Sequence, residues 1–504
     1  MNKLIKYIFI LLFSIITVLL ILVDTTIGYN YININKPDNF TILYILLTIF
    51  FIYLYLKMNK KNKLEKTINI NEKLIIKTMF FLLLIIQLVM LKNIYFESGW
   101  DVALLRVTAN NYANTNIFEN NIYYSQYPYF DIYPNNIFLT TIFGLILKFA
   151  YTINLTNPNK LLVLISIILV DLSGIIMIKT LKNFTSNKKI ILLSSVIFAL
   201  FIGLSPWFLI PYSDTYSIIF PISILYNYTK KDKTKYNYLL IGLLSLIGTF
   251  IKPTCIIILI SITILELIKF ISNKKKEFKI YFKKLSPLLL GILLAIILNS
   301  STQFIINYKP NKEKQFTFYH YLMMGINEKT NGAYSEEDVM NSIYQKNYQE
   351  RINYNKTIFI QRLKSFSIPD LLNFYLRKIL LNYNDGTLAW GREGEFYYQI
   401  ENNNSKTSEL LQNVFYNHGN YYNIFSSIMQ IIWITIIIST LVGSILKKED
   451  SKTNTLYLTI IGITLFILIF EARARYLYLY IPFFIITASL GLESINEKIK
   501  IYRA

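Results

Sequence analysis

The chain has 504 residues, of which 54% are hydrophobic and 16% are charged, and its mean hydropathy is +0.40. That apolar content exceeds what soluble domains carry, so the composition excludes a soluble globular protein and indicates a polytopic membrane protein. The net charge of +21 does not indicate a nucleic-acid partner, because the lysines gather in short loops between apolar segments and form no single basic face.

Apolar runs follow one another along the whole chain. We count roughly thirteen runs of about 17 to 20 residues, the length that a helix needs to cross a hydrocarbon core of roughly 30 Å. Because a helix satisfies its own backbone hydrogen bonds, the runs predict an all-α, polytopic transmembrane bundle of roughly 12 to 13 membrane segments. The first run, Met1 to Val23, has a basic start but no cleavage site of small residues, so we expect an uncleaved first span.

The lysine-rich loops orient the bundle. The positive-inside rule assigns these loops to the cytoplasm, and they are residues 57–73, 179–189, 230–235, 274–284 and 447–448. The alternate loops then face outward, at residues 93–136, 211–214, 252–253, 308–422 and 471–475. This arrangement predicts a multi-pass protein of the cell membrane with every candidate functional group on its outer face.

Three apolar runs lie between the first outer loop and the outward turn at residues 211–214, namely 137–153, 161–178 and 190–210. Two outward loops are separated by an even number of crossings, so the three runs cannot all span. We expect the first run, or part of its neighbour, to be a partial or interfacial segment. Asp171 in the second run is a rare intramembrane acid, for which a functional role and pairing with a neighbouring helix both remain open.

The loops divide the chain into four regions. Residues 1–73 hold two N-terminal helices and a basic loop, and residues 74–307 form a membrane core with the first outer loop at 93–136. Residues 308–422 form a mainly helical outer domain, and residues 423–504 return to the membrane and end in a cytoplasmic tail. The single cysteine, Cys255, excludes a disulfide within the chain and a metal site made of several thiols.

Short polar motifs stand at the outer ends of the predicted helices. They are Gly99-Trp100-Asp101-Val102, Pro211-Tyr212-Ser213-Asp214, His320-Tyr321-Leu322-Met323-Met324-Gly325, Asn384-Asp385-Gly386-Thr387 and Arg473-Ala474-Arg475-Tyr476. An acid after an early helix, an aromatic-rich outer loop ending at a Tyr-Pro pair, a second acid and a late outer domain resemble the plan of the C-type glycosyltransferase superfamily. The motifs themselves are similar to those of a family of integral membrane proteins of Gram-positive bacteria.

The resemblance implies transfer of a sugar from a polyprenyl-phosphate carrier to a cell-envelope acceptor: a wall polymer, a glycolipid or a surface protein. An attacking hydroxyl needs a carboxylate that takes its proton, and Asp101 is the candidate general base, with an interfacial helix cap as the structural alternative. Asp214 is the second catalytic candidate. It would orient the acceptor, or bind a divalent cation (Mg²⁺ or Mn²⁺) together with Asp101, or only cap the next helix.

The leaving phosphate needs fixed positive charge. Arg473 and Arg475 are the candidates, because a guanidinium fork fits phosphate oxygens and because an extended or unwound turn would align residues two apart. The alternative is an anchor at the membrane surface paired with Glu471. Lys252 is a second candidate phosphate contact.

Three further residues are candidates for substrate binding. Tyr133 belongs to the Tyr-Pro pair at the end of the first outer loop, and His320 is expected to shape the cap or the acceptor groove. Trp390 is a candidate for stacking on a sugar face, although an aromatic neighbour of the Asp385 turn is the plainer interpretation.

Two other classes of function remain open. A transporter, or a flippase for lipid-linked glycans, is also polytopic, but it concentrates its polar groups near the bilayer midplane and often in repeated halves. A non-catalytic scaffold of an envelope-synthesis complex needs none of the acids. For the enzyme, the expected partners are a polyprenyl-phosphate-linked sugar, an envelope acceptor and membrane lipid, without nucleic acid.

Overall fold

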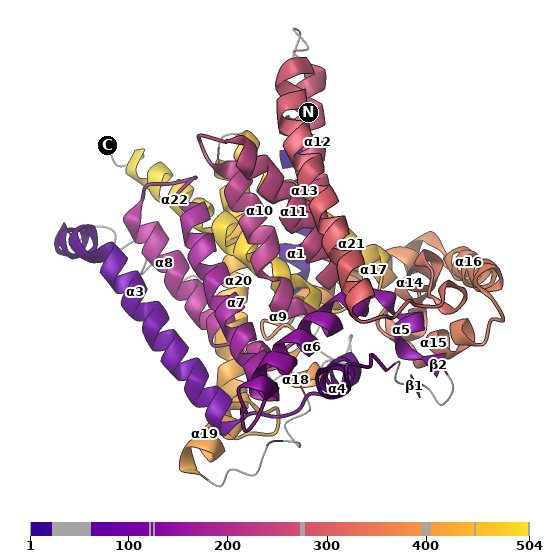
Figure 1. The fold of residues 1–504 in the computed structure, drawn as a ribbon. Coiled ribbons are helices and arrows are strands. Elements are labelled where there is room, and N and C mark those ends of the chain that lie inside the picture. The colour runs from indigo at the N-terminus through magenta and orange to yellow at the C-terminus, as the bar shows by residue number, and fades with distance from the viewer. Residues whose placement is uncertain are drawn as a thin grey trace.

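The structure is a computed structural model that describes residues 2–22, 62–119, 122–123, 127–272, 278–394, 400, 405–447 and 450–501. These residues form an all-α bundle, as the hydropathy pattern predicts, with one short antiparallel ribbon of β1 (Ile122–Tyr123) and β2 (Tyr127–Pro128) (Figure 1). The second of the two predicted N-terminal helices lies outside the described residues.

Eight helices of the described residues are long and apolar enough to cross a membrane. They are α1 (Asn2–Leu22), α3 (Asn62–Asn93), α7 (Asn159–Leu181), α12 (Ile256–Ser272), α13 (Phe278–Ile305), α20 (Tyr422–Leu446), α21 (Ser451–Ile469) and α22 (Ile481–Ile501). Shorter apolar helices complete the bundle, namely α8 (Lys188–Phe198), which continues as a π-helical turn, α10 (Ile219–Thr229) and α11 (Lys235–Ile251).

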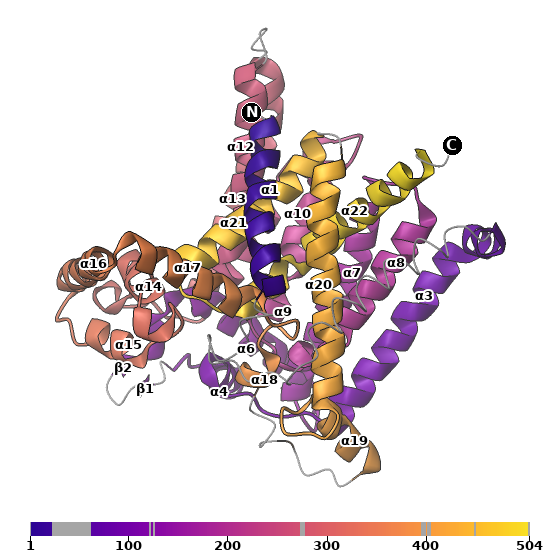
Figure 2. The same ribbon diagram turned by 180° about the vertical axis from the view of Figure 1, so that it is seen from behind.

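Ion pairs and hydrogen bonds fix which helix ends lie together. Lys182, just after α7, pairs with Glu72 of α3 at 2.8 Å, and Thr185 donates a hydrogen bond to Glu493 of α22 at 2.5 Å. We call this the lysine end of the bundle. The first residues of α1 and the last residues of α22 lie there too, at the top of Figures 1 and 2.

The opposite end, called the Asp101 end, carries α4 (Trp100–Thr115), α5 (Tyr129–Ile132), α6 (Ile137–Thr152), α9 (Ser213–Ser217), α18 (Trp390–Glu393) and α19 (Lys406–Phe415). Asn110 of α4 bonds to Asn159, where α7 begins, at 2.9 Å, and Tyr151 of α6 donates to Asn110 at 2.7 Å. Asn136, just before α6, lines the same cavity as Asp101. Both ends of α6 therefore lie at the Asp101 end, while α7 and α8 run between the two ends of the bundle, an arrangement that is compatible with the parity argument.

The intramembrane acid Asp171 lies on α7 and faces α3. Gln87 of α3 donates hydrogen bonds to Asp171 at 3.1 Å and to the carbonyl of Gly203 at 2.9 Å. Gly203 is the last residue of the π-helical turn that follows α8. A carbonyl at a helix end has no backbone N–H partner within the helix, so the Gly203 carbonyl is available to Gln87. The structure thus pairs Asp171 with a neighbouring helix, which was one of the two interpretations of this acid.

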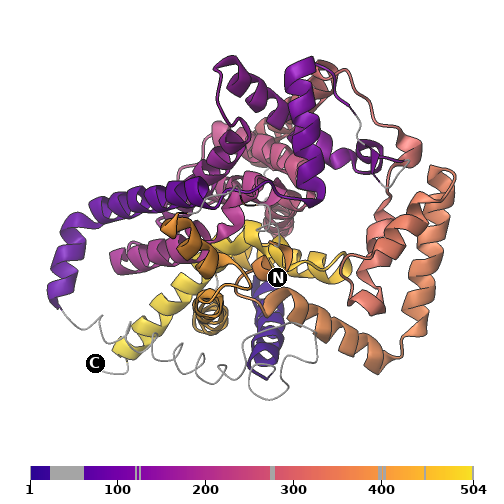
Figure 3. The ribbon, with the colours of Figure 1, turned by 90° about the horizontal axis from the view of Figure 1, so that it is seen from below.

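The helices between α13 and α18 form an arm beside the bundle. It contains α14 (Phe318–Gly325), α15 (Glu336–Ile343), α16 (Tyr348–Ser365) and α17 (Ile368–Tyr383), coloured salmon to orange in Figure 3. Arg362 of α16 holds the buried carboxylate of Asp338 in α15 with two hydrogen bonds, at 2.8 and 2.7 Å. Tyr383 ties the arm back to α21 through Thr464 at 2.6 Å. The arm is therefore fixed against the Asp101 end.

Candidate functional site

A cavity of about 550 Å³ lies at the Asp101 end, where segments far apart in the sequence meet. Its wall is formed by residues 132–136, by side chains from the segments 251–256, 315–324 and 466–476, and by Asp101, Tyr212, Ser213 and Tyr334. One part of the wall is apolar, with Ile251, Ile256, Phe318, Phe466 and Phe470, and another part is charged, with Asp101, Lys252, Glu471, Arg473 and Arg475. A cavity of this size and mixed character suits an amphipathic ligand.

Asp101 is the second residue of α4 and lies half-buried in the cavity wall. Tyr212 donates a hydrogen bond to Asp101 Oδ2 at 2.9 Å, and Tyr129 also hydrogen-bonds the carboxylate. Burial raises the pKa of both tyrosines, and the Asp101 charge raises it further, so both stay protonated donors. The carboxylate is therefore oriented by neutral hydroxyl groups.

The residue before the acid has an unusual backbone. Trp100 has a φ of 49°, and a non-glycine residue in such a sparsely populated conformation costs of order 1–3 kcal/mol. Its ring lies under the Arg475 guanidinium, 5.0 Å from ring centroid to Cζ. Two consecutive residues of this strained turn therefore serve the site: Trp100 makes a cation–π contact with Arg475, and Asp101 supplies the carboxylate.

Asp214 lies at the start of α9, and two cations hold it. The Lys252 ammonium pairs directly with Asp214 Oδ1, and Arg475 Nη1 lies 3.6 Å from Asp214 Oδ2. All three side chains are nearly inaccessible to solvent, with residue exposures of 4% for Asp214 and 5% for each cation. Charges buried to this degree require partners, so the three residues form one ion cluster.

Arg473 and Arg475 share a carboxylate that comes from a distant segment. Glu393 of α18 lies 3.2 Å from Arg473 Nη1 and 3.0 Å from Arg475 Nε. Arg473 has an extended backbone, with φ of −147° and ψ of 119°, and Arg475 lies in the 3₁₀ helix Ala474–Tyr480 that follows. This non-α-helical geometry brings two residues of an i, i+2 pair to the same partner, as we expected from their spacing.

Glu471 completes the cluster. It accepts hydrogen bonds from Arg473 Nε at 2.6 Å and from the Tyr476 hydroxyl at 3.0 Å. Burial raises the pKa of Glu471, but the charge and hydrogen bond of Arg473 outweigh burial and hold that pKa below its ordinary value. Burial lowers the pKa of Lys252, while the Asp214 charge opposes that effect. The pairing with Glu471 was the structural alternative for the arginines, and both it and the contact with the cavity are present.

Several buried polar atoms around the cavity have no hydrogen-bond partner among the described residues. They include His320 Nε2 and Asp214 Oδ2, whose nearest cation, Arg475 Nη1, lies 3.6 Å away. A buried polar atom without a partner costs about 1–3 kcal/mol, so a cluster of them at one cavity indicates that water or a ligand completes the set.

His320 lies in α14 and is fully buried at the cavity wall. Its Nδ1 lies 2.7 Å from Ser342 Oγ, and Ser342 donates its own hydrogen to Asn355 Oδ1 at 2.9 Å. Nδ1 therefore carries the ring proton and Nε2 is an acceptor. Burial lowers the pKa of His320 to about 3, so the ring stays neutral. Its Nε2 can accept one hydrogen bond from a ligand hydroxyl.

The structure brings Tyr133 to the same cavity but not Trp390. The Tyr133 ring packs edge-on against Phe316, with centroids 5.2 Å apart. Trp390 is 1% exposed, its indole N–H donates to the Phe415 carbonyl at 2.9 Å, and its ring packs against Trp207. In this structure Trp390 packs in the bundle interior, outside the residues that line the cavity.

The two candidate acids do not share a metal-binding arrangement. Among the described residues, no group of three or more His, Cys, Asp or Glu side chains could hold a metal ion. Asp214 is engaged by Lys252 and Arg475, and a divalent cation beside these two positive groups would be repelled. The residues present therefore do not fit a Mg²⁺ or Mn²⁺ ion between Asp101 and Asp214.

Sequence reasoning missed Glu393 and the two tyrosines that hold Asp101. Glu393 follows Trp390 in a short Gly-rich stretch whose pattern gives no sign of the arginine turn. Tyr212 was visible beside Asp214, but in a chain with 40 tyrosines its identity carried no signal. Glu393, Tyr129 and Tyr212 are assigned to the site because the fold brings them into contact with the arginines and Asp101, which their residue types alone did not predict.

Comparison with known proteins assigns the chain to a family. Residues 1–495 match a family model described as a conserved hypothetical integral membrane protein. No curated protein and no solved structure matches the chain. Because the match covers nearly the full length and the described residues contain eight helices suited to span a membrane, the chain belongs to this family of integral membrane proteins.

Proposed function

We propose that this protein is a glycosyltransferase that moves a sugar from a polyprenyl-phosphate carrier to a cell-envelope acceptor on the outer face of the membrane. The observation that carries the proposal is the juxtaposition, in one amphipathic cavity, of a tyrosine-held carboxylate with two buried cations, Lys252 and Arg475, and the partly buried Arg473. A sugar linked to a lipid phosphate has an apolar tail, an anionic centre and polar hydroxyls, which are the features that the cavity wall complements.

Asp101 is the proposed general base. As the acceptor hydroxyl attacks the sugar carbon, its proton passes to the Asp101 carboxylate, the new C–O bond forms, and the bond to the phosphate oxygen breaks with its electron pair. Tyr212 and Tyr129 keep the carboxylate oriented without neutralising it, because their hydroxyls are protonated donors. The partly exposed position at the cavity wall allows an acceptor hydroxyl to approach.

The cation cluster is the proposed site for the leaving phosphate. Breaking the sugar bond turns a phosphodiester into a phosphate monoester with additional negative charge, and preorganised cations stabilise that change. In the ion cluster three cations face three carboxylates, Asp214, Glu393 and Glu471. The contacts of both arginines use Nε and Nη1, and a guanidinium has five N–H donors, so Nη2 donors remain for phosphate oxygens.

This arrangement gives Asp214 a positioning role. Its two carboxylate oxygens face Lys252 and Arg475, so Asp214 holds these cations in position and does not act as the general base. The apolar wall formed by Ile251, Ile256 and Phe470 would contact the first isoprene units of the carrier.

Lipid analysis of a deletion strain tests the proposal. If the protein consumes a polyprenyl-phosphate sugar, that lipid should accumulate in the deletion strain, return to its ordinary level with the wild-type gene and remain high with Asp101→Asn. Unchanged amounts of every polyprenyl-phosphate sugar in all three strains would refute the donor assignment. Counterflow of a soluble substrate in vesicles would support a transporter instead.

A further inference from the structure

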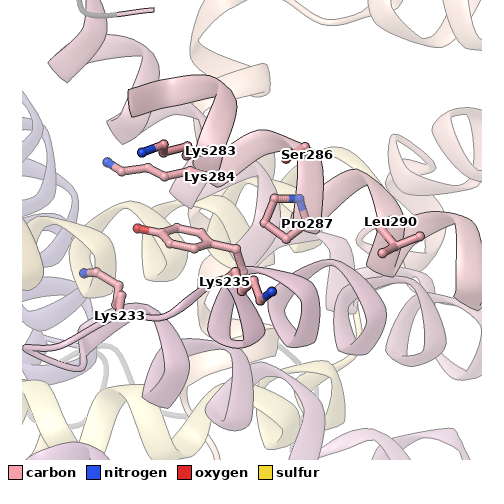
Figure 4. A pocket seen from close by; sticks show the side chains of 8 residues that line it. Lys233, Lys235, Lys283, Lys284, Ser286, Pro287 and Leu290 are labelled. Atoms are coloured by element: carbon pink, nitrogen blue, oxygen red, sulfur yellow. The ribbon is translucent and has the colours of Figure 1, made fainter. Parts of the chain in front are cut away.

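A second cavity, of about 680 Å³, lies at the lysine end between α11 and α13. The residues lining it are Lys233, Lys235, Tyr238, Lys283, Lys284, Ser286, Pro287 and Leu290. Figure 4 shows Lys233, Lys283 and Lys284 reaching toward one side of this cavity, with Pro287 and Leu290 on the other side. The cavity is thus cationic at one end and apolar at the other.

The four lysines that line this cavity outnumber the carboxylates beside it, because Glu266 pairs with only one of them, Lys284. None of the described residues that line it is acidic. Glu266 of α12 is the acid that contacts a lining residue, through its ion pair with Lys284 at 3.1 Å. The same carboxylate also pairs with Lys269 at 2.8 Å and accepts a hydrogen bond from the Tyr228 hydroxyl at 2.8 Å. Burial lowers the pKa of Lys233, and the positive charge of Lys269 lowers it further.

The walls of the cavity are held in place by close helix packing. A Cβ atom at Gly291 of α13 would lie 2.1 Å from the Leu239 carbonyl oxygen of α11, and one at Gly242 of α11 would lie 2.1 Å from the Leu288 carbonyl oxygen. Only glycine permits this approach of the two backbones. The separation of α11 and α13 beside the cavity is therefore set by contact between their backbones.

The apolar end of the cavity continues onto a surface that suits lipid. α13 exposes a row of large aliphatic side chains to the surroundings, including Leu289 at 51% and Leu290 at 48%. These residues belong to a helix that is long and apolar enough to span a membrane. An acyl chain could follow this row while a head group occupies the lysines, whereas a free inorganic anion would use only the lysines.

We propose that this cavity binds an anionic phospholipid, with its head-group phosphate at Lys233, Lys283 and Lys284 and one acyl chain along the Leu290 side of α13. The positive-inside rule places this end in the cytoplasmic leaflet, where anionic lipids attract basic groups next to membrane helices. The site is independent of the Asp101 cavity and of the function proposed for it.

Native mass spectrometry tests the site directly. The wild-type protein and a Lys233→Gln/Lys283→Gln variant are reconstituted in vesicles of equal parts phosphatidylglycerol and phosphatidylcholine, extracted in mild detergent and weighed with their retained lipid. We expect wild type to retain phosphatidylglycerol in preference to phosphatidylcholine. The double variant should bind it about 25-fold more weakly, since each lysine near anionic lipid contributes roughly 1 kcal/mol.

A matched control removes the same charge elsewhere at the same end. Lys188→Gln/Lys189→Gln, at the start of α8, should retain phosphatidylglycerol as wild type does. The single variant Lys283→Gln changes one exposed side chain, so it keeps the test valid if the double variant is unstable. It should bind phosphatidylglycerol about fivefold more weakly than wild type. Equal retention of both lipids by wild type, unchanged retention in the variants, or displacement of the lipid by inorganic phosphate alone would each overturn the proposal.

Discussion

The two ends of this bundle both gather positively charged side chains, but only one end matches them with carboxylates in the same cavity wall. At the Asp101 end each buried cation has a carboxylate partner, and the cluster of Lys252, Arg473 and Arg475 is held rigidly by acids from three segments. At the lysine end the cavity between α11 and α13 gathers lysines without acids in its wall. Cations that are paired with carboxylates can be buried and held in one orientation, which suits stabilisation of the charge that develops on a leaving phosphate. Cations without such partners stay near solvent and attract a permanent anion such as a lipid head group.

The largest effect in this comparison should come from the Asp101 carboxylate. Asp101→Asn should lower the rate of sugar transfer by about 100- to 10,000-fold, because a positioned general base contributes that much. Stability should change little, since an amide oxygen can still accept the bond from Tyr212. Transfer to envelope acceptor in membranes measures the rate, and thermal unfolding in detergent measures stability.

Glu97→Gln is the matched control for that experiment. Glu97 is a carboxylate of the same end, but it pairs with Arg106 at 2.5 Å and does not line the cavity. The control should keep its transfer rate. If Asp101→Asn and Glu97→Gln were equally active, Asp101 would not be the base.

The next effect should come from Arg475. Arg475→Ala should raise the KM for the polyprenyl-phosphate sugar about 30-fold, which corresponds to about 2 kcal/mol, because the variant removes a desolvated charge from the phosphate site. Arg475→Lys should give a smaller rise, since an ammonium keeps the charge but loses the bidentate fork. Unchanged donor kinetics combined with lower stability would make the arginine only an anchor.

Sidedness is tested by thiol labelling of intact cells after replacing Cys255. A cysteine in place of Lys329, whose side chain is 80% exposed in the arm, should react with an impermeant reagent. A cysteine in place of the exposed Lys231 at the lysine end should not. Asn384, the obvious choice in an outer loop from sequence, is fully buried and would report burial instead of sidedness. The reverse labelling pattern would exchange the two faces.

The smallest effect concerns Lys378, which joins the arm to the arginine turn. Its buried ammonium donates to the carbonyls of Gly325 and Phe470, at 2.5 and 2.6 Å. Burial lowers its pKa to about 7, whereas an unfolded lysine titrates near pH ~10.4. Between these values the unfolded chain binds more protons, so the contribution of Lys378 to stability should grow as pH rises from about 7 to about 10 and be lost as pH falls.

Thermal unfolding of wild type and Lys378→Met across that pH range measures this contribution. The methionine variant has no group that titrates at this position, so wild type should gain stability relative to it with rising pH. Parallel curves would show that Lys378 has an ordinary pKa in the folded protein.

The all-α architecture with several membrane-length helices could be predicted from hydropathy, and the lysine distribution adds a predicted sidedness. Both patterns reflect the cost of placing polar groups in hydrocarbon, which acts on each segment separately. The same logic predicted that the run 137–153, or part of its neighbour, is a partial or interfacial segment. It also predicted that Asp101, Asp214, Lys252, Arg473 and Arg475 lie at one end. In the structure Asp101, Lys252, Arg473 and Arg475 line one cavity, and Asp214 lies beside it, paired with Lys252 and Arg475.

The partners of these residues could not be predicted in the same way. Glu393 contacts Arg473 and Arg475 because the fold brings α18 next to the arginine turn. Glu393 and Arg473 are 80 residues apart in the sequence, and a local sequence pattern does not predict a contact over that separation. The sequence offered Trp390 as an aromatic neighbour of a turn or as a sugar-stacking residue. In the structure two consecutive left-handed residues, Leu388 and Ala389, precede Trp390, which is buried against Trp207. Tertiary packing decided both outcomes.

The central claim is that the Asp101 cavity transfers a sugar to the cell envelope, and the composition of the envelope tests it most directly. Wall polymers, glycolipids and surface proteins from a deletion strain would be compared by mass with those from strains that carry the wild-type gene, Asp101→Asn or Lys233→Gln/Lys283→Gln. We predict that one sugar substituent is absent in the deletion and Asp101→Asn strains and present in the other two. Identical masses in all four strains would contradict the account.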